Sequence, residues 1–65
     1  MPTITMPLEA LIALGVSRAE LTPKLTLDAK RALQPLLVPR GFDMCRPILL
    51  VELATAEGVG FVLSQ

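Results

Sequence analysis

Cys45 carries the most reactive side chain in this sequence, and Arg46 beside it supplies the kind of positive charge that favours a nucleophilic thiolate. Cysteine nucleophiles normally work with a base, usually histidine, and the chain contains no histidine. Free cysteines are also among the most buried residue types in proteins. We therefore expect Cys45 to pack in the interior and to have no catalytic role.

Four basic residues form a second set of candidates, because cations that converge can bind a phosphate or a carboxylate. These residues are Lys30, Arg31, Arg40 and Arg46. The alternative for this set is a solvated surface, which is the usual place of lysine and arginine. An anion site here therefore requires a fold that brings the four side chains together.

The remaining polar residues offer little further chemistry. A single cysteine without histidine cannot supply a usual zinc ligand set. Glu52 and Glu57 have a spacing that no catalytic carboxylate pair requires, and the short Gly58-Val59-Gly60 segment opens no helix that could hold a phosphate. The sequence thus predicts no catalytic residue, no metal and no cofactor.

Pro2 becomes the amino terminus if Met1 is removed, and a secondary amine in that position can act as a general base. The Met1-Pro2-Thr3-Ile4 start, the short length and the late strand resemble the 4-oxalocrotonate tautomerase family, which works in this way. The resemblance implies a small oligomeric enzyme with a site between subunits and Pro2 as its base. One long helix follows the first strand in that family, whereas here the segment is broken by Pro7, Gly15, Pro23 and Pro35. The substrate-binding arginines of that family have no match in this sequence.

The sequence of residues 47–65 predicts the β-hairpin around which the chain is organised. Residues 48–53 and 59–63 are rich in branched and aromatic side chains, and residues 54–58 carry a turn signal. A three-residue turn over residues 56–58, with Gly58 at positive φ, sets a register. In that register Leu53 faces Phe61 and Val51 faces Leu63, so these pairs form the core face.

The opposite face of this hairpin is the predicted interaction surface. In the register above it carries Ile48, Leu50 and Val62, with Glu52 among them. An antiparallel sheet normally keeps one face polar, so we expect this apolar face to meet another protein surface. Glu52 is expected at its rim, or in a pair with a base such as Arg46.

The segment before the hairpin predicts two short helices. The first covers residues 7–14, with Leu8, Leu11 and Ile12 on one face and Gly15 at its end. Ser17 and Glu20 have the spacing of a capping box, which predicts a single turn before Pro23.

The second helix begins after Thr26, a good N-cap residue. Its buried stripe is formed by Leu33, Leu36 and Leu37. Pro35 is expected to kink or end this helix near Gln34 because it lacks a backbone donor. Residues 38–47 then form a loop, and Thr3-Ile4-Thr5 alternates as a short additional strand would.

These elements predict one α+β domain over residues 1–65, with two short helices packed on a C-terminal antiparallel hairpin and a short N-terminal third strand. The chain is 52% hydrophobic, only 18% charged and has no net charge. Its mean hydropathy is +0.62. A domain of 65 residues has too much surface to hide so many apolar side chains, so we expect a homo-oligomer or an obligate subunit.

Charge and hydropathy also bear on the partners. No basic patch indicates nucleic acid, and no apolar run reaches the length of a membrane span. The start of the chain lacks the pattern of a secretory signal, so a cytoplasmic location is expected. The sequence thus predicts a non-catalytic protein-binding or assembly module, such as an accessory subunit, an antitoxin-like protein or a phage-type inhibitor of a host protein. The tautomerase-like enzyme with an intersubunit site is the alternative.

Overall fold

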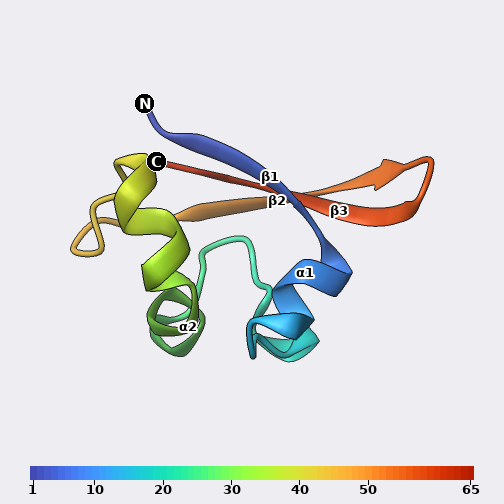
Figure 1. The fold of residues 1–65 in the computed structure, drawn as a ribbon, viewed down its shortest axis with the longest axis horizontal. Coiled ribbons are helices and arrows are strands. Elements are labelled where there is room, and N and C mark those ends of the chain that lie inside the picture. The colour runs from blue at the N-terminus through green and yellow to red at the C-terminus, as the bar shows by residue number, and fades with distance from the viewer.

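A three-stranded antiparallel sheet carries both helices of the protein on one face, in a computed structural model that describes residues 1–65 (Figure 1). This arrangement confirms the predicted α+β class, including the additional strand at the start of the chain. The strands and helices, in chain order, are β1 (Thr3–Pro7), α1 (Leu8–Ala13), α2 (Leu27–Leu37), β2 (Leu49–Thr55) and β3 (Gly58–Ser64). Two short 3-10 turns, Arg18–Glu20 and Val38–Arg40, flank α2.

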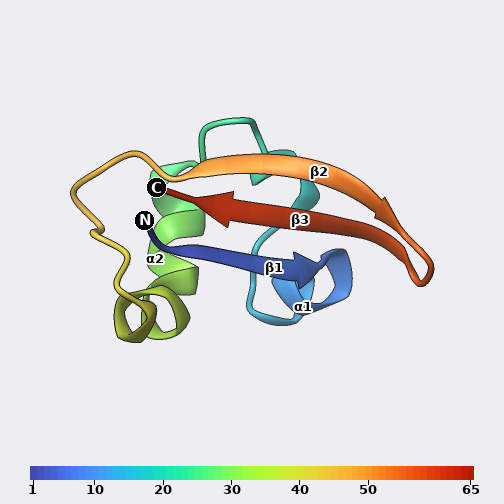
Figure 2. The same ribbon diagram turned by 90° about the horizontal axis from the view of Figure 1, so that it is seen from above.

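β3 is the central strand, because the order across the sheet is β1-β3-β2. β1 runs antiparallel to β3 from the Thr3–Ser64 pair to the Pro7–Gly60 pair. Beyond this ladder the backbone N–H of Gln65 donates to the carbonyl of Pro2 over 3.3 Å. The first and last residues of the chain therefore lie side by side, as both ribbon views show (Figures 1 and 2).

The register of the hairpin differs by one residue from the predicted register. Thr55 pairs with Gly58, so the connection is the two-residue turn Ala56-Glu57, and Val51 pairs with Val62. The predicted pairs of Leu53 with Phe61 and Val51 with Leu63 are wrong. Since side chains alternate along a strand, a slip of one residue turns every β2 side chain to the other face of the sheet.

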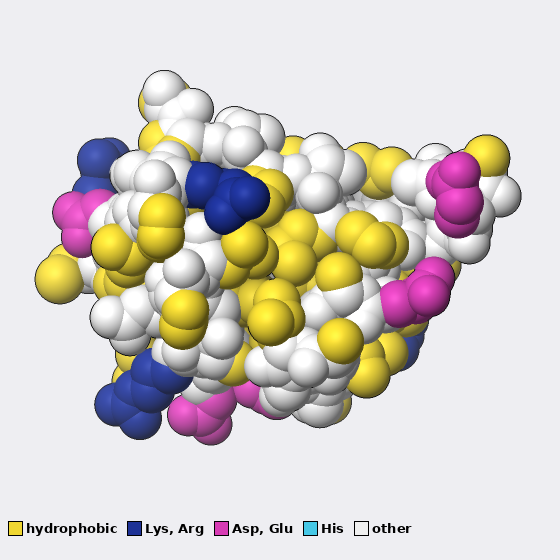
Figure 3. Space-filling view, in the orientation of Figure 1, with side chains coloured by type: hydrophobic (Ala, Val, Ile, Leu, Met, Phe, Trp, Pro, Cys, Tyr) yellow, Lys and Arg dark blue, Asp and Glu magenta, His cyan; other side chains and the backbone are white.

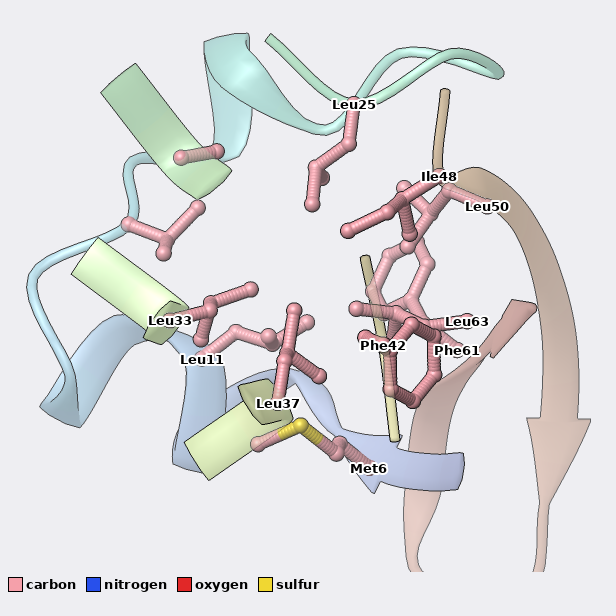
Figure 4. Close-up of a cluster of buried hydrophobic side chains, with 12 residues drawn as sticks. Met6, Leu11, Leu25, Leu33, Leu37, Phe42, Ile48, Leu50, Phe61 and Leu63 are labelled. Atoms are coloured by element: carbon pink, nitrogen blue, oxygen red, sulfur yellow. The ribbon is translucent and has the colours of Figure 1, made fainter. Parts of the chain in front are cut away.

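The consequence for the core is that Ile48 and Leu50 point inward, beside Phe61 and Leu63 (Figure 4). Leu50 and Leu63 are direct partners across the ladder. The faces of β3 are as predicted, with Phe61 and Leu63 toward the helices. Only β2 is inverted relative to the prediction.

Gly58 closes the turn at φ +127°, a conformation that side chains with a Cβ rarely adopt. A Cβ at this position would meet no atom within 4 Å, so conformation alone sets the cost of a substitution. We expect Gly58→Val to lower the free energy of unfolding by more than about 1 kcal/mol, because a β-branched residue is worst at positive φ. Urea unfolding followed by circular dichroism measures this, and an unchanged midpoint would contradict the strained turn.

α1 begins directly after Pro7, which is extended at φ −71° and ψ 154° and therefore suits both the strand end and the helix start. Gly15 follows the helix at φ +92°, as predicted for its end. Leu11 is fully buried and Leu8 is partly buried, but Ile12 is exposed, contrary to the prediction. The buried face of this short helix is thus narrower than its sequence indicates.

The capping interactions before and at the start of α2 are as predicted. Glu20 Oε1 accepts hydrogen bonds from the backbone N–H and the hydroxyl of Ser17, at 3.1 and 2.9 Å. The hydroxyl of Thr26 accepts from the backbone N–H of Ala29 over 3.2 Å. These local interactions fix where the 3-10 turn and α2 begin.

α2 does not end at Gln34, because the helix runs through Pro35 to Leu37. Arg31 and Pro35 are exposed, so water can satisfy the Arg31 carbonyl, which has no N–H partner at Pro35. Leu33 and Leu37 on the opposite side of the helix are fully buried. Burial of these two side chains therefore outweighs the unfavourable proline.

Residues 38–47 are more ordered than the predicted loop. Val38–Arg40 continues α2 as a 3-10 turn, and Gly41 ends that turn at φ +90°. The backbone N–H of Phe42 then donates to the carbonyl of Leu37, and the Phe42 ring enters the core (Figure 4). This ring fixes the path of the segment between α2 and β2.

The core lies between the helices and the inner face of the sheet, where side chains from every strand and both helices converge (Figure 4). Its twelve buried members are Met6, Leu11, Val16, Leu25, Ala29, Leu33, Leu37, Phe42, Ile48, Leu50, Phe61 and Leu63. No charged or polar side chain is buried among them. The sheet has no second layer of helices on its other face (Figure 1).

Candidate interaction surface on the outer face of the sheet

The face of the sheet that points away from the helices contains no charged residue. We call it the outer face and define it by alternation along the three paired strands. It comprises Thr3, Thr5 and Pro7 of β1, Gly60, Val62 and Ser64 of β3, and Leu49, Val51, Leu53 and Thr55 of β2. A wet sheet face normally carries charged side chains, so this composition is unusual.

The apolar part of the outer face lies on β2 and the middle of β3. Leu49 and Val51 are 51% and 59% exposed, which is high for such side chains. Leu53 and Val62 are partly buried, because neighbouring strands flank them. On β1 the exposed positions Thr3 and Thr5 are polar but uncharged. The face is therefore apolar at one side and hydroxyl-bearing at the other.

A hollow of about 360 Å³ interrupts the outer face next to Gly60. Thr5, Pro7 and Thr55 line it, together with Glu9 and Glu57, which are its only charged residues. Gly60 has no side chain to fill this space, and a Cβ there would lie only 3.2 Å from Cγ2 of Thr55. The outer face thus combines apolar projections with a depression, which gives it relief for shape complementarity.

The sequence-predicted interaction surface is corrected by the register. Ile48 and Leu50 are 0% and 7% exposed and belong to the core, so they cannot meet a partner in the folded protein. Of the three apolar residues predicted, only Val62 lies on the outer face. Leu49, Val51 and Leu53 take the place of the other two. The sequence carries no signal for the two-residue turn over Ala56-Glu57 that sets this register, because Ala-Glu is not a residue pair typical of such turns.

Glu52 is exposed beside the edge of β2 and does not pair with Arg46. Its carboxylate oxygen Oε1 lies 4.0 Å from a guanidinium nitrogen of Arg18. Both side chains are 58% exposed, so water screens this ion pair and it adds little stability. Glu52 is paired with the core residue Phe61 across the ladder, so it lies on the helix side of the sheet and not on the outer face.

The four basic candidates are only partly brought together. Lys30 Nζ donates to the carbonyl of Arg46 over 3.1 Å, which joins α2 to the loop before β2. Arg40 instead donates to the carbonyl of Leu36, one helical turn earlier. Arg31 is exposed and makes no side-chain hydrogen bond. Two of the four basic side chains thus donate to backbone carbonyls. This arrangement fits the alternative of a solvated surface better than a converging anion site.

Cys45 is exposed, contrary to the expectation of a packed thiol. It lies in a tight turn in which Asp43 Oδ1 accepts from its backbone N–H over 2.9 Å. The side chain of Gln65 holds this turn, since its oxygen accepts from the N–H of Asp43 over 2.7 Å and its nitrogen donates to the carbonyls of Asp43 and Arg46. This role of Gln65 could not be predicted from local sequence patterns, because the two contacting residues are more than twenty positions apart in the chain.

Pro2 is partly buried at the start of β1, beside Gln65. Its carbonyl is bonded in the sheet, and no side chain makes a hydrogen bond to it. The residues around Cys45 and Pro2 include no group of three potential metal ligands, nor does any other part of the chain.

Comparisons with protein-family models, with curated proteins and with solved structures found no match for this chain. None of its helices has the combination of length and apolar character that crossing a bilayer requires.

Proposed function

We propose that the protein is a small protein-binding or assembly module that acts through the outer face of its sheet. The observation that carries this proposal is the absence of both charge and helix cover on that face, where Leu49 and Val51 remain more than half exposed. Apolar side chains left in water favour association, because burying each one contributes roughly 1.5–3 kcal/mol. A partner for this face is another protein surface, either a copy of the chain or a different protein.

The chemistry of the face supports binding by shape and apolar contact. The chain has no net charge, and the strand residues of the outer face carry none, so that the only charges beside this face are those of Glu9 and Glu57 at the hollow. Electrostatic steering therefore contributes little, and affinity comes from the apolar side chains on β2 and β3, with the hydroxyl groups of β1 beside them. Interfaces with an apolar core and a polar rim have this composition. Leu49, Val51 and Val62 would form the apolar contact, with the threonines of β1 on its polar side.

The test places a charge at the centre of the outer face. Val51→Lys is expected to abolish outer-face association while the chain stays folded, because Val51 is exposed and its loss leaves no cavity. Sedimentation equilibrium of the pure protein measures self-association. Affinity purification from the source cells, with identification by mass spectrometry, measures binding to a different protein.

Val38→Lys is the matched control, since it makes the same substitution at an exposed valine on the 3-10 turn after α2. This variant should behave like the unmodified protein in both measurements. Equal mass and equal partner recovery for Val51→Lys, Val38→Lys and the unmodified chain would refute a binding role for the outer face.

A further inference from the structure

The two edges of the sheet are protected unequally. Along the edge of β2, the segment Pro23–Leu25 adds two backbone hydrogen bonds, from Leu25 N–H to Ile48 and from Leu50 N–H to Pro23, both at 2.9 Å. No segment pairs with the edge of β1. Figure 2 shows β1 at the margin of the sheet with β3 on its only paired side. An uncovered edge is a template for another strand.

The pairing of β1 with β3 determines which backbone N–H and C=O groups of β1 point to the open edge. Gln65 N–H donates to the carbonyl of Pro2, so Pro2 forms a hydrogen-bonded pair in the antiparallel pattern. Because this pattern alternates, Ile4 and Met6 also bond to β3, whereas the backbone groups of Thr3, Thr5 and Pro7 point to the open edge. Thr3 and Thr5 each leave one N–H and one C=O without a partner. Pro7 offers only a carbonyl, because proline has no N–H.

We propose that two copies of the chain pair through their β1 edges, antiparallel about a two-fold axis. This inference goes beyond the function proposed above, because it concerns the edge of β1 and not the outer face of the sheet. Thr3 of one copy lies opposite Thr5 of the other, and the symmetry repeats the pair. Each pair exchanges two hydrogen bonds, so every free N–H and C=O of both threonines is satisfied. Ile4 then lies opposite its own copy on the helix side.

The residues of β1 favour a second copy as the occupant. The strand Thr-Ile-Thr-Met-Pro has no charged side chain, so two copies approach without like-charge repulsion. Lysine and other charges that commonly block edge pairing are absent from it. The lack of an N–H on Pro7 disfavours registers that place it opposite a threonine, since the threonine carbonyl would then remain unpaired. The Thr3–Thr5 register is the one that uses both threonines fully.

Apolar surface beneath the β1 edge adds contact area to this strand pair. β1, α1 and the second half of α2 lie toward the viewer in Figure 1, as the view from above shows (Figure 2). On that side of the molecule hydrophobic side chains gather below the sheet (Figure 3). Ile4 on β1 and Leu8 at the start of α1 are hydrophobic and only partly buried. A strand pair alone buries little area, so this surface supplies the rest.

Hydrogen exchange at individual amides gives the first test. In the paired form the N–H groups of Thr3 and Thr5 are protected, and the protection is lost on dilution as the copies separate. The N–H groups of Ile4 and Met6 bond within one chain and keep their protection at every concentration. Rapid exchange of Thr3 and Thr5 at all concentrations would overturn the inference.

Proline substitutions give the second test, performed in the Val51→Lys background so that outer-face association is already removed. Val51→Lys alone is expected to sediment as two chains of 7.0 kDa each. Adding Thr5→Pro removes an outward N–H that a single chain leaves unbonded, so the mass should fall to one chain with the fold retained. Adding Ala54→Pro instead removes an outward N–H from the edge of β2, and this control should remain paired.

The two proposals fail separately. If adding Thr5→Pro leaves the mass unchanged, or if the Thr3 and Thr5 amides of the unmodified chain exchange rapidly at all concentrations, the β1 inference is wrong. A loss of association in Val51→Lys would still support the outer face. If the unmodified chain and Val51→Lys both sediment as two chains and no partner is recovered, the outer-face function is wrong and the β1 pairing stands.

Discussion

Ile48→Lys is expected to unfold the protein, whereas Leu49→Lys is expected to leave it folded. The two residues are adjacent, but Ile48 is 0% exposed in the core and Leu49 is 51% exposed on the outer face. Removing the isoleucine forfeits about 1.5–3 kcal/mol of apolar burial. A lysine at the same place must also be desolvated without a partner, which costs several kcal/mol more. The core of so small a domain supplies only about 3–5 kcal/mol in total.

Circular dichroism and one-dimensional NMR distinguish the two variants. Leu49→Lys should change the free energy of unfolding by no more than about 0.5 kcal/mol, as surface substitutions usually do. The opposite result, with Ile48→Lys folded and Leu49→Lys unfolded, would restore the three-residue turn and the register that follows from it. This pair of variants is therefore a direct test of which face of β2 is internal.

Leu33→Ala is expected to lower the free energy of unfolding by about 2–5 kcal/mol, the usual range for a leucine deleted from a packed core. Leu33 is fully buried on the side of α2 that faces the sheet (Figure 4). Truncation of this side chain leaves a cavity. It also removes part of the apolar contact with the sheet that keeps α2 helical despite Pro35. Urea unfolding followed by circular dichroism is the suitable measurement, because the chain has no tryptophan or tyrosine.

Leu27→Ala is the control on the same helix, since Leu27 is 60% exposed at its first position. This variant should unfold within about 0.5 kcal/mol of the unmodified protein. If Leu27→Ala and Leu33→Ala lower the free energy of unfolding equally, packing on the sheet is not what stabilises α2, and its intrinsic helix propensity is.

Local signals were sufficient to predict most elements of the fold. Thr26 marks the start of α2, Ser17 and Glu20 form the capping pair, and Gly15 follows α1. Each of these features depends on contacts within four residues, so the local sequence contains what decides them. The same holds for the positive φ of Gly58, which any short turn at that place requires.

The errors arose where contacts distant in sequence decide the outcome. Both faces of β2 are apolar, so composition could not distinguish the two registers, and only the pairing of Thr55 with Gly58 did. Pro35 remains within a helix because Leu33 and Leu37 are buried against other elements. The predicted interaction surface carried the same register error, which is why Val51 and Leu53 were placed in the core and Ile48 and Leu50 outside it.

The pairing of β1 with β3 also has a consequence for the order of folding. β2 and β3 are joined by two residues, whereas β1 must close a loop of some fifty residues before it reaches β3. Loop closure disfavours such contacts early, so the hairpin and the helices are expected to form before β1 docks. β1 precedes β3 in the chain, so during synthesis β1 stays unpaired until β3 has been made. Of the three strands, the one that completes the sheet is thus also the one that remains unpaired the longest.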